Sequence, residues 1–331
     1  MSIRVLATGP LTTVQDAGRT GFAAKGFRCC GAADGYALRL ANLLAGNENC
    51  RLAVLEMTLR GGTFQFEQDT LFALAGAEMP AVLNDAPAPS FAPLFAPAGS
   101  VLTVGTAKTG LRGYLAVYGG IDTPPVLGSR STDLKCRMGG LEGRALRAGD
   151  VLPVGADGRA ARQRWNTLPQ KSPLKEKSVC SPALPRRFLG QQAYPLFRAV
   201  PGPQADAFTA QGQADFVRSV YTLTPDCDRM ACKLLGTPLE AVNGVDIVSD
   251  GIVAGSVQVS ANGQPIVMLA DHQTTGGYAK IATVIGADLP ALAQLRPGEA
   301  LTFTYVTASR AVVAARQQAA QLEQIRKRME G

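Results

Sequence analysis

The sequence predicts a mainly β protein built from two β-barrel-like halves of related design. Gly and Pro are abundant, at 36 and 21 residues, and aromatic residues make up only 6%. Turn formers at this density between short apolar runs favour many strands joined by turns. Apolar residues make up 46% of the chain and charged residues 18%, so the 331 residues can bury a sizeable core.

A faint internal repeat indicates the two halves. A strand-like run stopped by Gly-Pro opens each half, at residues 4–10 and 198–203. Each half also closes on a Gly-acid-apolar step, at residues 149–152 and 298–301. We therefore expect a duplication of one β-rich unit.

The stretch between the halves has a different composition. Residues 156–196 hold five prolines, several Lys and Arg, and the single tryptophan, Trp165. Such a stretch suits a linker that crosses a surface, and Trp165 is expected to anchor it by packing rather than to bind a ligand. The expected division is an N-terminal half at 1–155, the basic, Pro-rich linker at 156–196, and a C-terminal half with a terminal helix at 197–331.

Short apolar runs broken by Gly, Asn-Asp or Asn-Gly predict the strands. Examples lie at residues 71–75, 115–118, 252–259 and 266–270. Asn262-Gly263 lies between the last two runs and predicts a hairpin turn.

Two helices are expected. Asp34 can cap the first, Gly46 can end it, and its apolar residues fall at helical spacing: Ala37, Leu38, Ala41, Leu44 and Ala45. The second runs from Ser309, ends in a cationic turn that complements the helix dipole, and carries one apolar stripe: Val312, Ala315, Ala319, Leu322 and Ile325.

The composition excludes several function classes. The formal charge of +7 is concentrated at 159–187 and 326–328 and suits an anionic small molecule or an acidic partner. No zinc-finger spacing or basic stretch interleaved with aromatics points to nucleic acid. No apolar run reaches the roughly 18 to 20 residues of a membrane span, and no signal peptide is evident, so we expect a cytoplasmic protein.

The cysteines and the single histidine restrict the chemistry. Seven cysteines without a disulfide-framework spacing suggest reduced thiols. One imidazole, His272, cannot supply a multi-histidine metal site, so no metal is expected in this chain. The phosphate-binding loop G-x-x-x-x-G-K-[ST] is absent, so any ATP chemistry proceeds without that loop or on another chain.

The segment 271–280 is the densest candidate site. It holds a carboxylate, an amide, two hydroxyls, two glycines, a phenol and an ammonium. The glycine amides can approach a ligand closely, and the hydroxyls can hydrogen-bond an oxygen-rich substrate. The alternative is a polar hairpin end that follows a buried strand.

Two further segments carry candidate polar groups. Asp16 can act as an acid or base, or can hold Arg19 in an ion pair that closes a loop. Residues 129–133 can grip a carboxylate through Arg130 and the neighbouring hydroxyls, or can form a capped turn. Asp34 and Asn42 are expected to be structural, and the role of Glu56 stays open.

Several motifs together resemble the biotin-dependent carboxyltransferase family, also called the KipA family, to which a 5-oxoprolinase component belongs. They occur in family order over nearly the whole chain. The longest are Gly-Pro-Leu-Thr-Thr-Val-Gln-Asp-Ala-Gly-Arg at 9–19, Leu-Gly-Ser-Arg-Ser-Thr-Asp at 127–133 and Asp-His-Gln-Thr-Thr-Gly-Gly-Tyr at 271–278, with shorter matches at 31–34, 38–42, 46–47, 55–58, 114–121, 201–204, 228–230 and 249–252.

The resemblance implies two tandem cyclophilin-like β-barrel domains and a part in the ATP-dependent opening of 5-oxo-L-proline to L-glutamate. The expected partners are two further proteins, one KipI-like and one LamB/YcsF-like, and a small anionic substrate, with ATP consumed by the complex. A carboxyltransferase for a urea-like acceptor and a regulatory antagonist of a KipI-type kinase inhibitor are the alternatives. The chain has no Met-Lys-Met biotin attachment sequence.

The resemblance and the side-chain chemistry together give a set of expected site residues, and both halves are expected to contribute to one cleft. The expected catalytic residues are Asp16, Asp271 and Tyr278. The expected substrate-binding residues are Arg19, Arg130, Gln204, Gln273, Thr274, Thr275, Gly276, Gly277 and Lys280.

The chain departs from the family pattern at a few positions. His272 stands where Arg is usual, which removes a permanent cation beside the densest motif. The other departures are Cys30, Ala33, Cys227, Ala231, Ser260 and Ala279.

Overall fold

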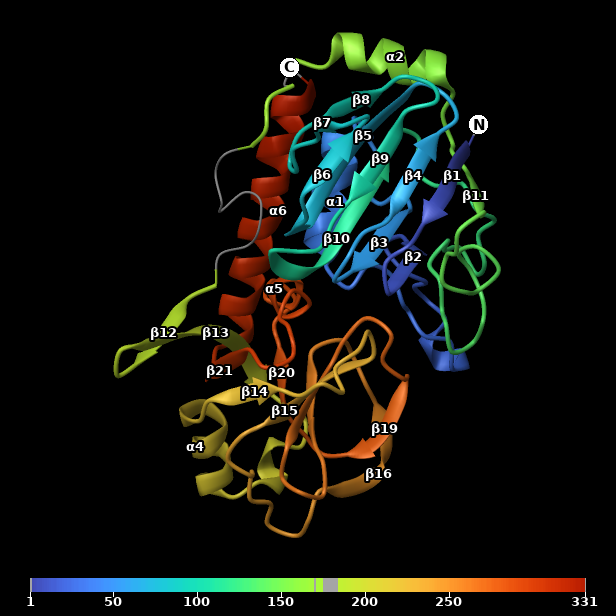
Figure 1. The fold of residues 1–331 in the computed structure, drawn as a ribbon. Helices are drawn as coiled ribbons and strands as arrows, with labels where there is room; N and C mark the ends of the chain where they lie inside the picture. Colours follow the sequence, from blue (N-terminus) through green and yellow to red (C-terminus); the bar gives the residue numbers. More distant parts are fainter. Residues whose placement is uncertain (1, 170, 175–183, 331) are drawn as a thin grey trace. The chain divides into compact units, whose positions relative to one another are not determined.

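The computed structural model describes residues 2–169, 171–174 and 184–330, which form two compact units (Figure 1). The first unit holds residues 2–20, 30–169, 171–174 and 319–330, and the second holds 21–29 and 184–318. Strands account for 36% of the residues and helices for 19%, so the expected mainly β class is confirmed.

The first unit contains two antiparallel sheets. The strand orders are β11-β1-β4-β9-β6-β7 and β2-β3-β10-β5-β8. The strands are β1 (Ser2–Ala7), β2 (Leu11–Gln15), β3 (Val54–Thr58), β4 (Thr63–Phe66), β5 (Thr70–Glu78), β6 (Ala81–Leu83), β7 (Ala86–Pro87), β8 (Leu94–Ala96), β9 (Val101–Val104), β10 (Thr109–Val117) and β11 (Val151–Pro153).

A single core joins the two sheets. Phe64 and Phe66 of β4 pack with Phe72 of β5 and Leu115 of β10, and all four side chains are fully buried. The predicted run at 71–75 lies in β5, and the run at 115–118 covers the end of β10 and the residue after it; these are the longest strands of this unit. Inward-facing side chains from two sheets are what a two-layer β architecture requires.

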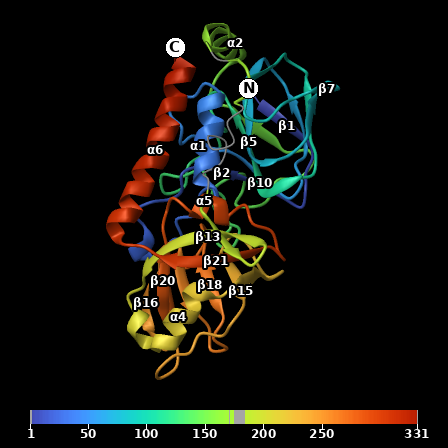
Figure 2. The ribbon, with the colours of Figure 1, turned by 90° about the vertical axis from the view of Figure 1, so that its left-hand side faces the viewer.

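Helices cover the outer face of the second sheet. Along β5, Phe72 and Leu74 belong to the core between the sheets, whereas Leu71, Ala73 and Ala75 belong to a second buried cluster. This cluster includes helix α1 (Gly35–Leu44) and the last turns of helix α6 (Ala308–Glu330), which run along the same side of the unit in Figure 2. Both faces of β5 are therefore buried.

Helix α1 (Gly35–Leu44) forms as the sequence predicts. The Asp34 carboxylate accepts a hydrogen bond of 2.8 Å from the Ala37 amide, which satisfies one of the first free N–H groups. Gly46 follows the helix with φ of 78°, a left-handed conformation that glycine adopts without a steric cost.

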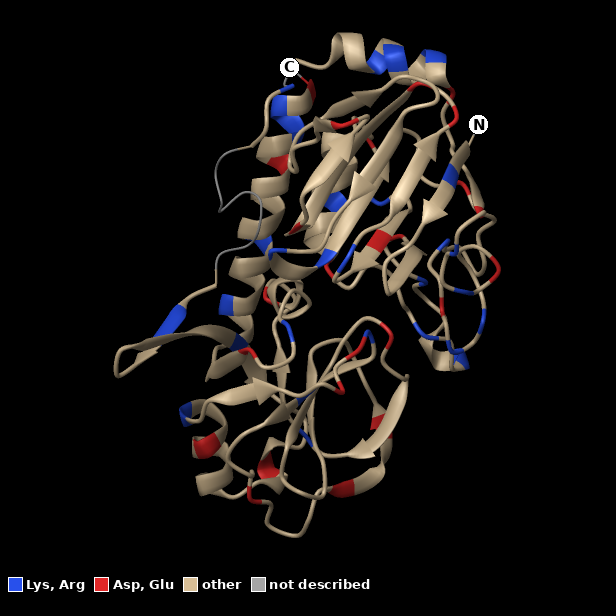
Figure 3. Ribbon diagram, viewed as in Figure 1, with Lys and Arg blue, Asp and Glu red and all other residues tan. Residues whose placement is uncertain are grey.

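The stretch predicted as a linker contains regular structure. It begins with helix α2 (Gly158–Thr167), whose Arg159, Arg162 and Arg164 contribute to the basic segment (Figure 3). Trp165 on this helix stacks on Phe95 of β8 at a centroid distance of 5.8 Å. The expected packing role of Trp165 is confirmed.

The second unit is built around a closed barrel. The ring runs β13-β20-β17-β18-β15-β14-β21, and parallel pairing of β13 with β21 closes it. The strands are β12 (Arg186–Leu189), β13 (Gln192–Pro201), β14 (Tyr221–Leu223), β15 (Ala231–Leu235), β16 (Asp246–Gly251), β17 (Ser256–Val259), β18 (Pro265–Met268), β19 (Thr275–Tyr278), β20 (Lys280–Val284) and β21 (Ala300–Tyr305).

The predicted hairpin is part of this barrel. Strands β17 and β18 pair antiparallel across the turn at Asn262-Gly263, where Gly263 has φ of 76°. Strands β16 and β19 form a separate two-stranded sheet. The helical segments of this unit are η1 (Ala23–Lys25), η2 (Ala205–Ala207), α4 (Ala210–Arg218), α5 (Leu289–Leu292) and the first turns of α6 (Ala308–Glu330).

The predicted C-terminal helix is confirmed as α6, but part of its predicted apolar stripe is wrong. Leu322 and Ile325 are buried, whereas Val312, Ala315 and Ala319 are exposed. Helical periodicity determines which residues share a face, but it does not determine where along the helix a neighbouring element covers that face. Within the described residues, no helix is both long and apolar enough to cross a membrane.

The corrected stripe predicts a contrast in stability. Ile325→Ala should lower the free energy of unfolding by about 2 to 5 kcal/mol, because it opens a cavity in a closed cluster. Val312→Ala, at a side chain that is 49% exposed, should change it by less than about 0.5 kcal/mol. Urea unfolding of both variants measures the difference, and equal losses would contradict this assignment.

Candidate functional site

The Asp16 carboxylate is the centre of the polar cluster in the first unit. It follows β2, and its Oδ1 accepts hydrogen bonds from the Gly18 amide (2.8 Å) and from the Ser129 and Ser131 hydroxyls (2.6 Å each). Its Oδ2 accepts one from the Arg130 amide at 2.6 Å. Asp16 therefore ties the end of β2 to the loop at 129–131.

Arg19 does not pair with Asp16, so the predicted ion pair is wrong. Its guanidinium is buried and donates to the backbone carbonyls of Val126 (3.0 Å) and Ser131 (2.9 Å). The backbone carbonyls of the 126–131 loop, and not the Asp16 carboxylate, are therefore the acceptors for the Arg19 guanidinium. Among the described residues, its buried Nη1 has no hydrogen-bond partner, which leaves one donor group of this cation unused.

A polar cavity of about 390 Å³ lies beside Asp16. Arg130 lines it, and its Nη2 lies 2.5 Å from Oδ1 of Asp122, so this cation is paired at the cavity wall. The predicted Arg130 and Asp16 thus share one cavity. Its lining residues are Asp16, Ala17, Gly18, Thr20, Asn49, Arg51, Leu52, Ala53, Gly119, Ile121, Asp122, Gly128 and Arg130.

The segment 129–133 forms a capped turn. Asp133 Oδ1 accepts hydrogen bonds of 3.0 Å from the amides of Lys135 and Cys136, and the Thr132 hydroxyl donates to the Val14 carbonyl. The Ser129 and Ser131 hydroxyls of this motif donate hydrogen bonds to a carboxylate, as their chemistry suggested. That carboxylate is Asp16 of the same chain.

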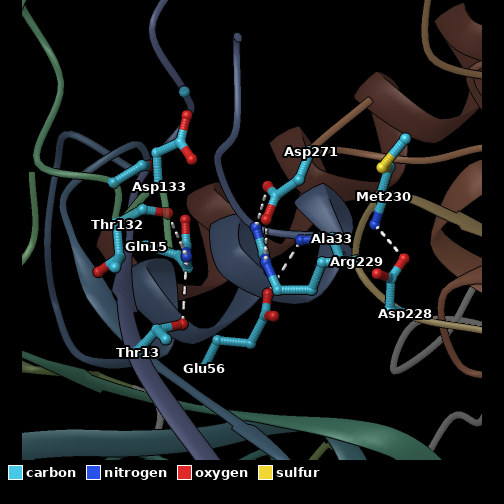
Figure 4. A network of polar contacts seen from close by, with 12 residues as sticks. Thr13, Gln15, Ala33, Glu56, Thr132, Asp133, Asp228, Arg229, Met230 and Asp271 are labelled. Carbon is cyan, nitrogen blue, oxygen red and sulfur yellow. Dashed lines mark hydrogen bonds and ion pairs between the residues drawn. The ribbon is translucent and has the colours of Figure 1, made fainter. Parts of the chain in front are cut away.

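Glu56, which the sequence left open, anchors the start of α1. Its Oε2 accepts hydrogen bonds from the Ala33 amide (2.9 Å, Figure 4) and the Tyr114 hydroxyl (2.8 Å). The Tyr114 oxygen in turn accepts from the Asp34 amide. Complete burial raises the pKa of Tyr114 well above its usual range, so this phenol stays a neutral donor.

Two buried side-chain amides, those of Asn42 and Gln15, lie in the same unit. Asn42 donates to the carbonyls of Leu38 (3.1 Å) and Leu52 (2.9 Å), which confirms its structural role. Gln15 donates to Thr13 and to the Thr132 carbonyl (Figure 4). Within the described ranges, its buried Oε1 accepts no hydrogen bond.

In the second unit, Asp271 forms a bidentate ion pair with Arg229 (Figure 4). The Nε–Oδ2 and Nη2–Oδ1 distances are both 2.9 Å, and both residues are buried. The Asp271 amide also donates to the Arg229 carbonyl at 2.9 Å. Arg229 was not among the expected site residues, although it lies in the family-like motif at 228–230.

The residues that follow Asp271 form a turn and then strand β19. His272 is buried and its Nδ1 lies 2.7 Å from the Gln273 carbonyl oxygen. The Gln273 Oε1 is buried and, among the residues described, has no partner. The Thr274 carbonyl accepts from the Ile252 amide at 3.0 Å, and β19 then pairs with β16.

Of the two glycines of β19, Gly276 is the more closely packed. A Cβ on Gly276 would lie 2.6 Å from the Ile252 side chain and 2.8 Å from the Gln258 amide nitrogen, closer than real Cβ atoms approach. Gly277 lies in the same strand, between this contact and Tyr278. Thr275 and Tyr278, the ends of β19, are exposed.

Gln204 and Lys280 are brought together by Asp250. Lys280 Nζ lies 2.7 Å from Asp250 Oδ2, and the Gln204 side chain donates to the same oxygen at 3.1 Å. The hydrogen bond from Lys280 lowers the pKa of Asp250 to about 2. Asp250 was missed as a site residue, although it lies in the family-like motif at 249–252.

The expected site residues thus fall into one cluster in each unit. Asp16, Arg19 and Arg130 lie together in the first unit. The remaining expected residues lie in the second unit. Most of them belong to the segment 271–278, and Gln204 contacts Lys280, which follows this segment. That the two units contribute to one cleft stays a prediction.

The family model described as "Carboxyltransferase domain, subdomain A and B" matches residues 25–305. The chain belongs to this carboxyltransferase-domain family. It is 40% identical to the C subunit of 5-oxoprolinase from Escherichia coli (strain K12) over 98% of this chain and 97% of that protein. It is 38% identical to the protein of the same name from Haemophilus influenzae, over 98% of both chains.

Larger proteins contain a similar region. The chain is 29% identical to urea amidolyase of Lachancea kluyveri over 92% of its own length, but it spans only 17% of that protein. Its fold matches the solved urea amidolyase of K. lactis with a TM-score of 0.84 at 28% identity, covering 98% of this chain and 20% of that one. The solved protein TTHA0988 matches at 33% identity with a TM-score of 0.73, over 92% of this chain and 55% of that one.

The lowered pKa of Asp250 predicts how stability depends on pH. A carboxyl group whose pKa is lower in the folded than in the unfolded chain stabilises the fold. This stabilisation is complete above the unfolded-state pKa of about 3.9, and it is lost as the pH falls through the folded-state pKa of about 2. The melting temperatures of the natural chain and Asp250→Asn should therefore differ at neutral pH and converge as the pH falls from about 4 to about 2. Asp246→Asn, on the same strand, is the control, and a gap for Asp250→Asn that is constant with pH would contradict the assignment.

Proposed function

We propose that this chain is the C subunit of a 5-oxoprolinase, a complex that opens 5-oxo-L-proline to L-glutamate with consumption of ATP. The observation that carries the proposal is the extent of the similarity. The 5-oxoprolinase subunits match over essentially their whole length at 40% and 38% identity. The urea amidolyases match at lower identity and over a small part of theirs, so a urea-directed carboxyltransferase is the less favoured function.

The reaction determines what the site must supply. A lactam is a poor electrophile because its nitrogen lone pair is delocalised into the carbonyl group. Phosphorylation of the carbonyl oxygen by ATP makes the carbon open to attack by water. The site then needs a cation for the substrate carboxylate and hydrogen-bond donors where negative charge develops.

Several polar groups of the chain fit these needs. Arg19 carries an unused, buried donor, and Arg130 lies at the wall of a polar cavity, so both are candidates for the substrate carboxylate. Thr275 and Tyr278 present hydroxyl donors. Gln273, with Thr274 beside it, offers a buried side-chain oxygen to a substrate N–H group.

The two expected catalytic carboxylates suit a positioning role. Asp16 accepts four hydrogen bonds from its own chain, and both oxygens of Asp271 are engaged by Arg229. These contacts fix the orientation of both carboxylates and occupy the oxygens that a base would turn toward water. The base that activates water is therefore expected to be a residue other than Asp16 and Asp271.

The proposal includes two partner proteins. A KipI-like chain and a LamB/YcsF-like chain would complete the enzyme, and ATP would bind on one of them. We also propose that the complex works in the cytoplasm, where the described cysteines would stay reduced.

Reconstitution tests the function. Coexpression with the two partners should give a complex that co-elutes in size-exclusion chromatography and releases glutamate from 5-oxoproline only when ATP is present. This chain alone should be inactive. Two separate, fully active species, or a co-eluting biotin carboxylase that carboxylates urea, would overturn the proposal.

The exposed hydroxyls of β19 give a sharper test. Thr275→Val and Tyr278→Phe each remove one hydroxyl, and a lost donor to developing negative charge lowers turnover by roughly 10² to 10³. Because both residues are exposed, the free energy of unfolding should change by less than about 0.5 kcal/mol.

The matched control is Thr237→Val, an exposed threonine of the same unit, which should alter neither quantity. Normal turnover with a lowered melting temperature in both β19 variants would show that this strand is scaffolding.

A further inference from the structure

Two cysteines flank a tight turn in the second unit. The turn is closed by a hydrogen bond of 3.1 Å from the Asp228 amide to the Ala231 carbonyl. The Asp228 carboxylate also accepts from the amides of Met230 (2.7 Å, Figure 4) and Ala231 (3.1 Å). Cys227 directly precedes the turn and Cys232 directly follows it on β15, so the thiols lie on opposite arms of a hairpin.

Hairpin geometry brings such positions within disulfide range. Directly opposite residues of antiparallel strands have Cα atoms about 4.5 to 5.5 Å apart, and disulfides span about 4.4 to 6.8 Å. Cys227 also packs against the buried cluster to which Cys232 belongs, and its thiol donates a hydrogen bond of 3.4 Å to the carbonyl of Lys233, the residue after Cys232. Their side chains therefore point to the same side of the hairpin.

We propose that Cys227 and Cys232 are a peroxide-reactive dithiol that closes to an intrachain disulfide. The partly exposed thiol of Cys227 is the attacking group and the buried thiol of Cys232 resolves the intermediate. The reactant that this site takes is a small hydroperoxide.

The environment of the two thiols gives them different tasks. The hydrogen bond from Cys232 lowers the pKa of Cys227 to about 7, so a large share of this thiol is ionised at neutral pH. The thiolate is the nucleophile in thiol chemistry. An ion pair beside the turn joins Lys233 and Asp226 at 3.6 Å. Cys232 is only 3% exposed and is therefore reached from Cys227 rather than from solvent.

The chemistry balances in two steps. The Cys227 thiolate attacks one peroxide oxygen, an S–O bond forms, the O–O bond breaks, and the leaving hydroxide takes a proton to give water. The Cys232 sulfur then attacks the Cys227 sulfur, an S–S bond forms, the S–O bond breaks, and a second water leaves with the Cys232 proton. Two thiols are oxidised to one disulfide, and the hydroperoxide is reduced.

The turn between the thiols is attached to the segment that precedes β19. Arg229 in the turn holds Asp271, and the Met230 carbonyl accepts a hydrogen bond of 2.8 Å from the Leu269 amide. A crosslink at the base of this turn therefore acts on the residues that position Asp271. The disulfide itself does not depend on the proposed enzymatic function.

Peptide mapping of the full chain tests the proposal. After brief exposure to hydrogen peroxide and alkylation of the remaining thiols, trypsin cleaves after Arg218, Arg229 and Lys233. Peptides 219–229 and 230–233 should then be joined, with the loss of two hydrogen atoms, and dithiothreitol should separate them. Alkylation of Cys227 in the reduced protein should increase with pH around a midpoint of about 7.

Variants separate the two roles. Cys232→Ser should stop the crosslink and let dimedone trap a sulfenic acid at Cys227, whereas Cys227→Ser should stop both products. Cys136→Ser, at an exposed cysteine outside the pair, should leave the crosslink unchanged. Full alkylation of Cys227 after peroxide treatment, or a crosslink from Cys227 to another cysteine, would overturn the proposal.

Discussion

The hydrogen bonds to the Asp16 carboxylate are the interaction on which the candidate site of the first unit depends. Hydrogen bonds to a charged acceptor are roughly twice as strong as neutral ones, and this carboxylate accepts four. They hold the 129–131 loop against the end of β2, and the Ser131 carbonyl in that loop orients Arg19. The placement of both arginines in this cluster follows from this one contact.

The second unit uses its charges in the same way. Asp271 holds Arg229 and Asp250 holds Lys280, so these charged groups near β19 are already paired within the chain. In each pair the cation is buried, and the carboxylate supplies the partner that a buried charge requires. The candidate ligand-binding groups near β19 are therefore neutral donors and acceptors. The charge pairs hold the surrounding backbone in place.

The sequence was sufficient for features that depend on local chemistry. Helix α1 follows from the Asp34 cap and apolar spacing, and the β17–β18 hairpin follows from Asn262-Gly263. Features that depend on distant contacts were not accessible. Arg19 bonds to carbonyls more than a hundred positions away, and no local pattern distinguishes those acceptors from Asp16.

The site residues show the same limit. Polar motifs identified which segments gather, since Gln204 and Lys280 do meet, but they could not show that Asp250 joins them. Gly276 was expected to open the backbone to a ligand, and in the structure a Cβ there would meet the ends of the Ile252 and Gln258 side chains. The sequence alone does not predict such contacts, because they form only when separate strands assemble.

The course of helix α6 has a consequence for how the chain is made. Its Leu322, Ile325 and Met329 complete the buried cluster over α1 in the first unit, yet they are synthesised after the whole of the second unit. During synthesis, the apolar side chains that these three residues contact stay exposed until the last turns of α6 leave the ribosome. The first unit begins the chain but is the later of the two to be completed.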